Sequence, residues 1–422
     1  MRLLALIIFI VMYILIIALA KYRVWVVLSA AVLYLVLGIL PITELGTAIN
    51  FNALMMIAGT MVIVYYFIDS QMPNRISGFL LSKSRNVMWV TILMSLFAGL
   101  ISAFIDNVAT VLMVAPVGLA ICKKLSVSPV PMLLSIAVSS NLQGAATLVG
   151  DTTSIMLGAY AHMDFMDFFV SESRPGMFFA VELGALATLP IMMFLFKKDK
   201  APVLAIDKTT LKSVLPSIML LGMVALLICV SFIPNKPDIT NGLICCGLAA
   251  LTILFDFGKM KAGSRVLEAV TSIDFETLLL LTSLFIVIGG ITEIGIIDEL
   301  AGLIVKIGGN NIFLLYTMIV WGSVLVSAVV DNIPYVATML PVIRSLTLSL
   351  GMEPSLLYFG LLCGATLGGN LTPIGASANI TAVGMLRKEG YSVSFGDFAR
   401  IGMPFTLAAV TAGYVFIWLV WS

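Results

Sequence analysis

The sequence SAFIDNVAT at residues 102–110 occurs again as SAVVDNIPY at residues 327–335, an offset of 225 (102 to 327). The match continues downstream without gaps, with Pro116 opposite Pro341, Pro129 opposite Pro354, Gly144 opposite Gly369, Thr147 opposite Thr372 and Gly150 opposite Gly375. A repeat of this length predicts two halves with the same architecture. We place the N-terminal repeat at residues 1–200, a linker at 201–212 and the C-terminal repeat at 213–422.

The composition is that of a membrane protein. Hydrophobic residues make up 61% of the 422 residues and charged residues 11%, whereas soluble domains carry about 25% charged residues. Uncharged runs such as Leu3–Ala20 and Met177–Phe196 approach the roughly 20 residues that cross a hydrocarbon core. The first run leads into Lys21 and a further span without a small-residue cleavage site, so we interpret it as mature structure rather than a signal peptide.

The predicted fold is an all-α membrane protein with about ten transmembrane helices and two re-entrant hairpins in two inverted-topology repeats. The first half is expected to contain spans at 2–20, 24–40, 51–69 and 177–196, a hairpin at 88–122 and a broken helix at 132–160. The second half is expected to contain spans at 213–233, 239–255, 275–297 and 403–421, a hairpin at 312–349 and a broken helix at 355–382.

Basic residues predict the orientation of these segments in the membrane. Lys and Arg gather at 21–23, 75–85, 123–124, 197–212, 259–265 and 387–400, and we place these loops in the cytoplasm. The apolar segment between 75–85 and 123–124 then enters and leaves from one side as a hairpin. An odd number of spans per half inverts the second half, so its hairpin enters from outside. The alternative is two ordinary helices in place of each hairpin.

Three carboxylates, Asp106, Asp151 and Asp331, lie deep in apolar sequence. A charged side chain at the bilayer centre costs at least about 2.5 to 3.5 kcal/mol. No Lys or Arg lies inside the same apolar segments, and the nearest, Lys123 and Arg344, lie at their ends. We therefore expect the three carboxylates to lack basic partners and to be neutralised by a bound cation or proton.

Small polar residues accompany these carboxylates. Ser139–Asn141, Gly144–Thr147 and Gly150–Thr153 interrupt the first broken helix, and Gly368–Asn379 (GGNLTPIGASAN) interrupts the second. Glycine and proline free backbone carbonyls and amides there. Carbonyl, Asp, Asn and Thr oxygens suit a hard cation such as sodium, and half-helix N-termini attract anions. Tight helix packing explains the alanines of these runs but not the embedded Asp and Asn.

At these motifs the sequence resembles the ion transporter superfamily over nearly its whole length. The likeness is to the arsenite permease and melanosomal P-protein branch, to the NhaD-type sodium/proton antiporters and, more distantly, to the divalent-anion/sodium symporters. Ser102–Thr110 looks like the first hairpin tip and Asp331–Pro334 like the second, while Gly368–Asn379 and Gly390–Phe395 are very similar to the P-protein branch. Gly150–Ser154 (GDTTS) departs from the Gly-Asp-Pro-Pro-Asn element of that branch and resembles the antiporters instead.

The resemblance implies an elevator-type transporter, in which a transport domain slides against a scaffold domain, with one cation site at each hairpin tip. By position, the cation sites consist of Asp106, Asn107, Thr147, Gly150 and Asp151 in the first repeat and Asp331, Asn332, Thr372 and Gly375 in the second. The candidate Na⁺ ligands are Asp106, Asn107, Asp151, Asp331 and Asn332. The substrate is expected between the sites, against Asn107, Asn141, Thr152, Asn332, Ser377 and Asn379.

The predicted function is ion-coupled secondary active transport, driven by Na⁺ or H⁺, of a small anion or oxyanion of the dicarboxylate, citrate or arsenite class. The alternative is Na⁺/H⁺ antiport, in which Asp106, Asp151 and Asp331 bind sodium and protons in competition. A passive ion channel is a second alternative, against which two Asp-Asn hairpins of opposite orientation argue. An enzyme is not expected, because the spans contain no Ser/His/Asp set and no metal cluster.

The remaining features point to no further ligand. A net charge of +1 gives no nucleic-acid footprint, and the five cysteines lack metal-binding spacing. We expect no cofactor besides the coupling ion. The expected location is the cell membrane, as a multi-pass protein whose partners are the lipid bilayer and the transported solute, and related families suggest a homodimer.

Overall fold

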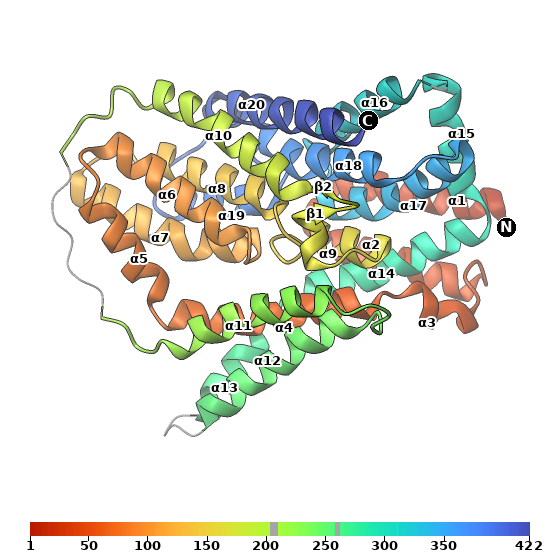
Figure 1. Cartoon of the computed structure of the whole chain (residues 1–422), viewed down its shortest axis with the longest axis horizontal. Coiled ribbons are helices and arrows are strands. Elements are labelled where there is room, and N and C mark those ends of the chain that lie inside the picture. Colours follow the sequence, from red (N-terminus) through yellow and green to blue (C-terminus); the bar gives the residue numbers. More distant parts are fainter. Residues whose placement is uncertain (203–209, 258–261, 310) are drawn as a thin grey trace.

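The computed structural model describes residues 1–202, 210–257, 262–309 and 311–422, and it is built almost entirely of helices (Figure 1). The α-helices are α1 (Arg2–Ala18), α2 (Arg23–Val36), α3 (Leu45–Ala48), α4 (Phe51–Asp69), α5 (Met72–Ser82), α6 (Val87–Ser102), α7 (Asn107–Leu125), α8 (Val130–Gly144), α9 (Thr152–Ala161), α10 (Met177–Leu195), α11 (Leu215–Ser231), α12 (Thr240–Phe257), α13 (Ala262–Thr271), α14 (Phe275–Glu293), α15 (Ile296–Gly308), α16 (Ile312–Ser327), α17 (Asn332–Leu350), α18 (Ser355–Gly368), α19 (Ser377–Lys388) and α20 (Phe395–Trp421). Short 3₁₀-helices are η1 (Ala20–Tyr22), η2 (Ile42–Glu44), η3 (Phe165–Phe168) and η4 (Gly369–Leu371). The predicted all-α class is confirmed.

A two-stranded hairpin between α9 and α10 is the exception among the described elements. Its strands are β1 (Val170–Ser171) and β2 (Arg174–Pro175), and they pair antiparallel. The two turn residues, Glu172 and Ser173, both have positive φ angles, of 51° and 63°. Two such residues are typical of the tight turn that joins neighbouring antiparallel strands.

The helices pack in two groups. In one group α4 packs against α11 and α12, and α14 packs against α1, α2 and α4. In the other group α6 and α7 pack against α8, while α16, α17 and α20 pack against α18. Figure 1 shows α4, α11, α12 and α13 along its lower edge, away from α10 and α20 at the upper edge. Contacts between the groups include those of α4 with α9 and of α14 with α17, and the cavity described below lies at this junction.

The repeat in the sequence is also a repeat of helix boundaries. An offset of 225 separates the first residues of α7 and α17, of α8 and α18, and of α9 and α19. An offset of 224 separates both the first and the last residues of α4 and α14. Helix starts that match residue by residue show that equivalent sequences take equivalent local structure.

Each hairpin turns at its acidic residue because that residue caps the returning helix. Asp106 precedes α7, and its Oδ2 accepts hydrogen bonds from the backbone N–H groups of Val108 (3.0 Å) and Ala109 (3.1 Å). Asp331 precedes α17 in the same way, and its Oδ1 accepts from the N–H of Ile333 (3.1 Å). A carboxylate at the positive end of a helix dipole is favourable.

The two broken helices are interrupted where a glycine meets a hairpin turn. A Cβ atom on Gly150 would lie 2.7 Å from the carbonyl oxygen of Ser102 and 2.8 Å from that of Ala103. A Cβ atom on Gly375 would lie 2.8 Å from the carbonyl oxygen of Ser327. Only glycine lets the interrupted backbone approach the hairpin turn this closely.

Three connecting helices differ from the sequence analysis. The segment 75–85, expected to be a basic loop, largely forms α5, and α13 and α15 were not predicted either. In α5 the buried residues Pro73, Ser77 and Leu81 recur every fourth position, as in a helix with one buried face. Arg75 within the helix, and Lys83 and Arg85 just after it, make the segment resemble a basic loop. The linker 201–212 and the loop 259–265 fall in part on residues 203–209 and 258–261, outside the described residues.

Many of the described helices have the length and composition of membrane segments. Six segments are long and apolar enough to cross a hydrocarbon core unaided: Phe51–Asp69, Asn107–Leu125, Met177–Leu195, Arg265–Glu293, Asn332–Leu350 and Phe395–Trp421. Shorter apolar helices are α1, α2, α6, α11, α12 and α18. This range of lengths suits both complete crossings and the arms of hairpins.

Candidate functional site

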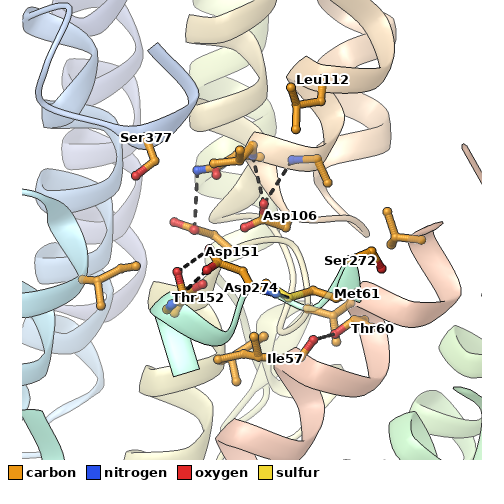
Figure 2. A pocket seen from close by; sticks show the side chains of 18 of the residues that line it. Ile57, Thr60, Met61, Asp106, Leu112, Asp151, Thr152, Ser272, Asp274 and Ser377 are labelled. Carbon is orange, nitrogen blue, oxygen red and sulfur yellow. Dashed lines mark hydrogen bonds between the residues drawn. The ribbon is translucent and has the colours of Figure 1, made fainter. Parts of the chain in front are cut away.

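A cavity of about 410 Å³ lies where the first hairpin tip, the start of α9, the C-terminal half of α4 and the start of α14 meet. Figure 2 shows Asp106, Asp151, Thr152 and Asp274 gathered in this region, with Ser377 beside them. Six of the residues predicted from sequence line the cavity: Asp106, Asn107, Asp151, Thr152, Asn332 and Ser377. The fold therefore brings residues from both repeats to one place.

Asp106 presents its carboxylate to the cavity from the N-terminus of α7. Its Oδ2 is held by the two backbone N–H groups of the helix. None of the ion pairs in the described part of the chain involves this residue. The helix N-terminus stabilises part of the negative charge, but no basic side chain among the described residues neutralises it.

Asp151 lies between the two hairpin tips and is 4% exposed. Its carboxylate accepts a hydrogen bond from Thr153 Oγ1 at 2.7 Å, and longer ones of 3.5 Å from the Nδ2 atoms of Asn107 and Asn332. Asn107 and Asn332 are equivalent residues of the two repeats. All three donors are neutral, and the ion pairs of the described residues do not include Asp151 either. A buried carboxylate in such surroundings is costly unless a cation or proton balances its charge.

Asp331 differs from the other two, and the prediction that it lacks a basic partner is wrong. The guanidinium of Arg23, the first residue of α2, forms an ion pair with Asp331 Oδ2. Ser377 Oγ donates a hydrogen bond to the same carboxylate oxygen at 3.2 Å. The error arose because Arg23 was assigned to a cytoplasmic loop, whereas the fold brings it to a residue 308 positions away.

Two charged residues of the cavity wall, Arg23 and Asp274, were not predicted from the sequence. Asp274 caps α14, accepting hydrogen bonds from the N–H of Thr277 at 3.0 Å and from its Oγ1 at 2.6 Å. Its position one residue before Phe275, the counterpart of Phe51, could have indicated a cap at the start of a span. No local pattern marks Arg23 as a residue of the site.

Four predicted cation-site residues brace the hairpin tips instead of lining the cavity. The hydroxyl groups of Thr147 and Thr372 donate hydrogen bonds to the carbonyl oxygens of Ala103 and Ala328 respectively. Gly150 and Gly375 make the close backbone approaches described above. The four residues hold each hairpin turn against its broken helix and so position Asp106 and Asp331.

Asn141 and Asn379, predicted to bind substrate, are fully buried behind the cavity wall. Asn141 Nδ2 donates to the carbonyl oxygen of Thr366 at 2.7 Å and to Asn370 Oδ1 at 3.1 Å, and its Oδ1 accepts from Asn107 Nδ2 at 2.9 Å. Asn379 Nδ2 donates to the carbonyl oxygens of Gly369 (3.0 Å) and Thr372 (3.2 Å). Both side chains hold the broken helices in shape, and Asn141 also links the two repeats.

We expect Asn141→Ala to destabilise the protein by about 2 to 4 kcal/mol, because three buried polar groups each lose a hydrogen bond. The matched control is Ser135→Ala in the same helix, since Ser135 is fully buried and its Oγ has no hydrogen-bond partner. Thermal unfolding midpoints in detergent measure both effects. Equal midpoints for the two variants would contradict the bracing role of Asn141.

The chemistry of the cavity suits a hard cation better than a soft transition metal. Within the described chain no three His, Cys, Asp or Glu side chains cluster as a metal site. The wall instead offers carboxylate, amide and hydroxyl oxygens, the ligands that hard cations prefer.

Comparisons with known proteins agree with this picture. The model of the citrate transporter family matches residues 7–364 and 248–422. The uncharacterized transporter Rv2684 of Mycobacterium tuberculosis is 30% identical over 429 residues, covering 99% of this chain and 98% of its own length. The human P protein is 26% identical over 468 residues, and the match covers 92% of this chain and 56% of the P protein.

A solved structure supports the fold. The YdaH transporter of Alcanivorax borkumensis superposes with a TM-score of 0.62 at 14% sequence identity, covering 89% of this chain and 87% of that one. The predicted resemblance to the ion transporter superfamily is confirmed, as are a multi-pass membrane location and a transport rather than an enzymatic role. The chain belongs to the citrate transporter family of transmembrane transporters.

Proposed function

We propose that the protein is a secondary active transporter in which a Na⁺ or H⁺ bound at Asp106 and Asp151 drives the movement of a small anion. The observation that carries this proposal is the pair of carboxylates on one cavity wall with neutral hydrogen-bond donors and no ion pair to any described residue. Such a pair is costly inside a membrane unless a cation or proton balances it. Loading and release of that cation can therefore be coupled to transport.

The charge of the cavity sets the order of binding. Among the described residues, its wall carries Asp106, Asp151 and Asp274 but only one basic residue, Arg23, which is already paired with Asp331. An anion meets a negative surface until a cation has bound, so the cation binds first. The family's description as citrate transporters favours a carboxylate-bearing solute, and arsenite is the second anionic candidate.

A second cavity supports alternating access. It has a volume of about 510 Å³ and lies against the C-terminal half of α14 and the middle of α17, lined by Glu293 and Arg344 among others. Along α9, Ile155 lines the first cavity and Met156 the second, and both side chains are buried. A path interrupted by packed apolar side chains favours a transporter over a passive channel. On the basis of the family resemblance, we also propose about ten crossings with two re-entrant hairpins in inverted repeats, an elevator movement and a homodimer.

Na⁺/H⁺ antiport is the second candidate function. The excess of carboxylates over basic residues on the cavity wall favours it, because such a wall attracts cations without any anion. In that case sodium and protons would occupy Asp106 and Asp151 alternately.

Flux into proteoliposomes under imposed gradients tests the two functions. We expect saturable uptake of citrate, succinate or arsenite to rise at least about tenfold when an inward sodium or proton gradient is applied. This expectation follows from a cation-loaded site that binds the anion more tightly. Radioactive sodium uptake driven by an outward proton gradient, without any added anion, would instead identify the antiporter.

Two results would contradict coupled transport. Flux that does not saturate and does not respond to either gradient would indicate a channel. The absence of any flux of anions and of sodium, with protein that remains monodisperse, would exclude both candidate functions.

A further inference from the structure

The two hairpin tips are equivalent in backbone but not in charge. Asp106 and Asp331 are counterparts, as are Asn107 and Asn332, and Thr152 and Ser377. The position of Asp151, however, is taken by Ala376 in the second repeat. The first tip therefore has two carboxylates within the site and the second has one.

A proline leaves the second carboxylate with one backbone donor where the first has two. Ala109 donates a backbone N–H to Asp106, and its counterpart is Pro334, which has no N–H. Asp331 is consequently capped by one backbone N–H group, that of Ile333 on Oδ1, whereas Asp106 accepts two on Oδ2. Its Oδ2 accepts from Arg23 and from Ser377.

The position of Arg23 is not explained by its own helix. Arg23 is the first residue of α2, where the positive end of the helix dipole disfavours a cation. Its side chain is 26% exposed and lines the cavity, and its second terminal nitrogen lies 3.5 Å from Ser377 Oγ. The ion pair with Asp331 offsets this unfavourable placement. The guanidinium is therefore part of the second hairpin tip, although Arg23 lies on α2.

We propose that Arg23 is a built-in cation, which occupies at the second hairpin tip the place that an exchangeable cation takes at the first. This inference rests on the proposed function, since it assumes an exchangeable cation at Asp106 and Asp151. It differs from the two equivalent sites that the sequence predicts. The protein then binds one coupling cation in each transport cycle, and Asp331 stays ionised throughout.

Carbodiimide labelling of the full-length protein in lipid nanodiscs tests the inference. Dicyclohexylcarbodiimide reacts with protonated carboxyl groups in apolar surroundings, and peptide mass spectrometry identifies the labelled residue. In the wild type we expect labelling at Asp106 or Asp151 that sodium or a higher pH suppresses at least about fivefold, and no labelling of Asp331 under any of these conditions. A carboxylate held ionised by a guanidinium lacks the proton that the reagent needs.

Substitution of Arg23 provides the second arm. In Arg23→Gln, we expect labelling of Asp331 to rise at least about tenfold and to become sensitive to sodium or pH. Arg23→Lys keeps the positive charge and is the matched control, in which Asp331 stays unlabelled. If Arg23→Gln fails to fold, the wild-type labelling pattern alone still decides.

The outcomes separate this inference from the proposed function. Cation-sensitive labelling of Asp331 in the wild type would overturn the inference, because Asp331 would then be an exchangeable site. No labelling of Asp331 in folded Arg23→Gln would overturn it as well. Labelling of Asp106 and Asp151 that responds neither to sodium nor to pH would instead contradict the proposed function, whatever happens at Asp331.

Discussion

Asp106→Asn and Asp151→Asn are each expected to reduce cation-coupled flux at least roughly 100-fold, which corresponds to about 2.7 kcal/mol of lost cation binding. The amide keeps the shape of the carboxylate but removes one of the two charges that we assign to the cation. Neither residue has a basic partner within the described structure, so no charge is left unbalanced by the substitution. Proteoliposome uptake under a sodium or proton gradient measures the effect.

The control for this experiment is Glu353→Gln, which removes an exposed carboxylate that does not line the cavity. This variant should transport as the wild type does. All variants should show equal yields and equal thermal midpoints, since the loss concerns binding and not folding. Coupled flux at the wild-type rate in both aspartate variants would mean that the cation binds elsewhere.

Gly150→Ala is expected to destabilise the protein by about 3 kcal/mol or more, or to prevent folding. The added Cβ would lie 2.6 Å from the carbonyl oxygen of Gly144, 2.7 Å from that of Ser102 and 2.8 Å from that of Ala103. All three atoms belong to the backbone, so no side chain can rotate away to make room. The hairpin tip and the broken helix would have to separate, and Asp106 would move with the tip.

Gly247→Ala is the matched control for this substitution. A Cβ atom on Gly247, within α12, would meet no atom within 4 Å. Alanine in a helix is favoured over glycine by up to about 1 kcal/mol, so this variant should be unchanged or slightly more stable. The two variants are compared by their thermal unfolding midpoints and their monodisperse fractions in detergent. Similar values for both variants would argue against the close approach at Gly150.

Much of the architecture can be read from the sequence because it depends on local chemistry. Asp106 and Asp331 cap the helices that directly follow them, α7 and α17, and Gly150 and Gly375 mark the breaks in the two broken helices. The apolar runs likewise indicate the long helices. The amphipathic helices α5, α13 and α15 were missed because each buries only part of its surface and carries charged residues that resemble those of a loop.

The roles of individual site residues could be predicted only in part. Residue type and repeat position placed Asp106, Asp151 and Ser377 together, and the structure brings them to one cavity. The same reasoning could not tell a residue that faces the cavity from one that braces it, as Thr147 and Asn141 do. The direction of a side chain depends on the packing of helices from both repeats.

The sequence by itself determined the two-fold repeat, the helix breaks, and the three acidic residues within apolar segments. Only the tertiary structure decided which of these acids is already neutralised. An ion pair between Arg23 and Asp331 joins residues 308 positions apart, and no periodicity or local spacing reports such a contact. Electrostatic balance within a membrane protein is a property of the assembled helices, because it depends on which charges the fold brings within a few ångströms of each other.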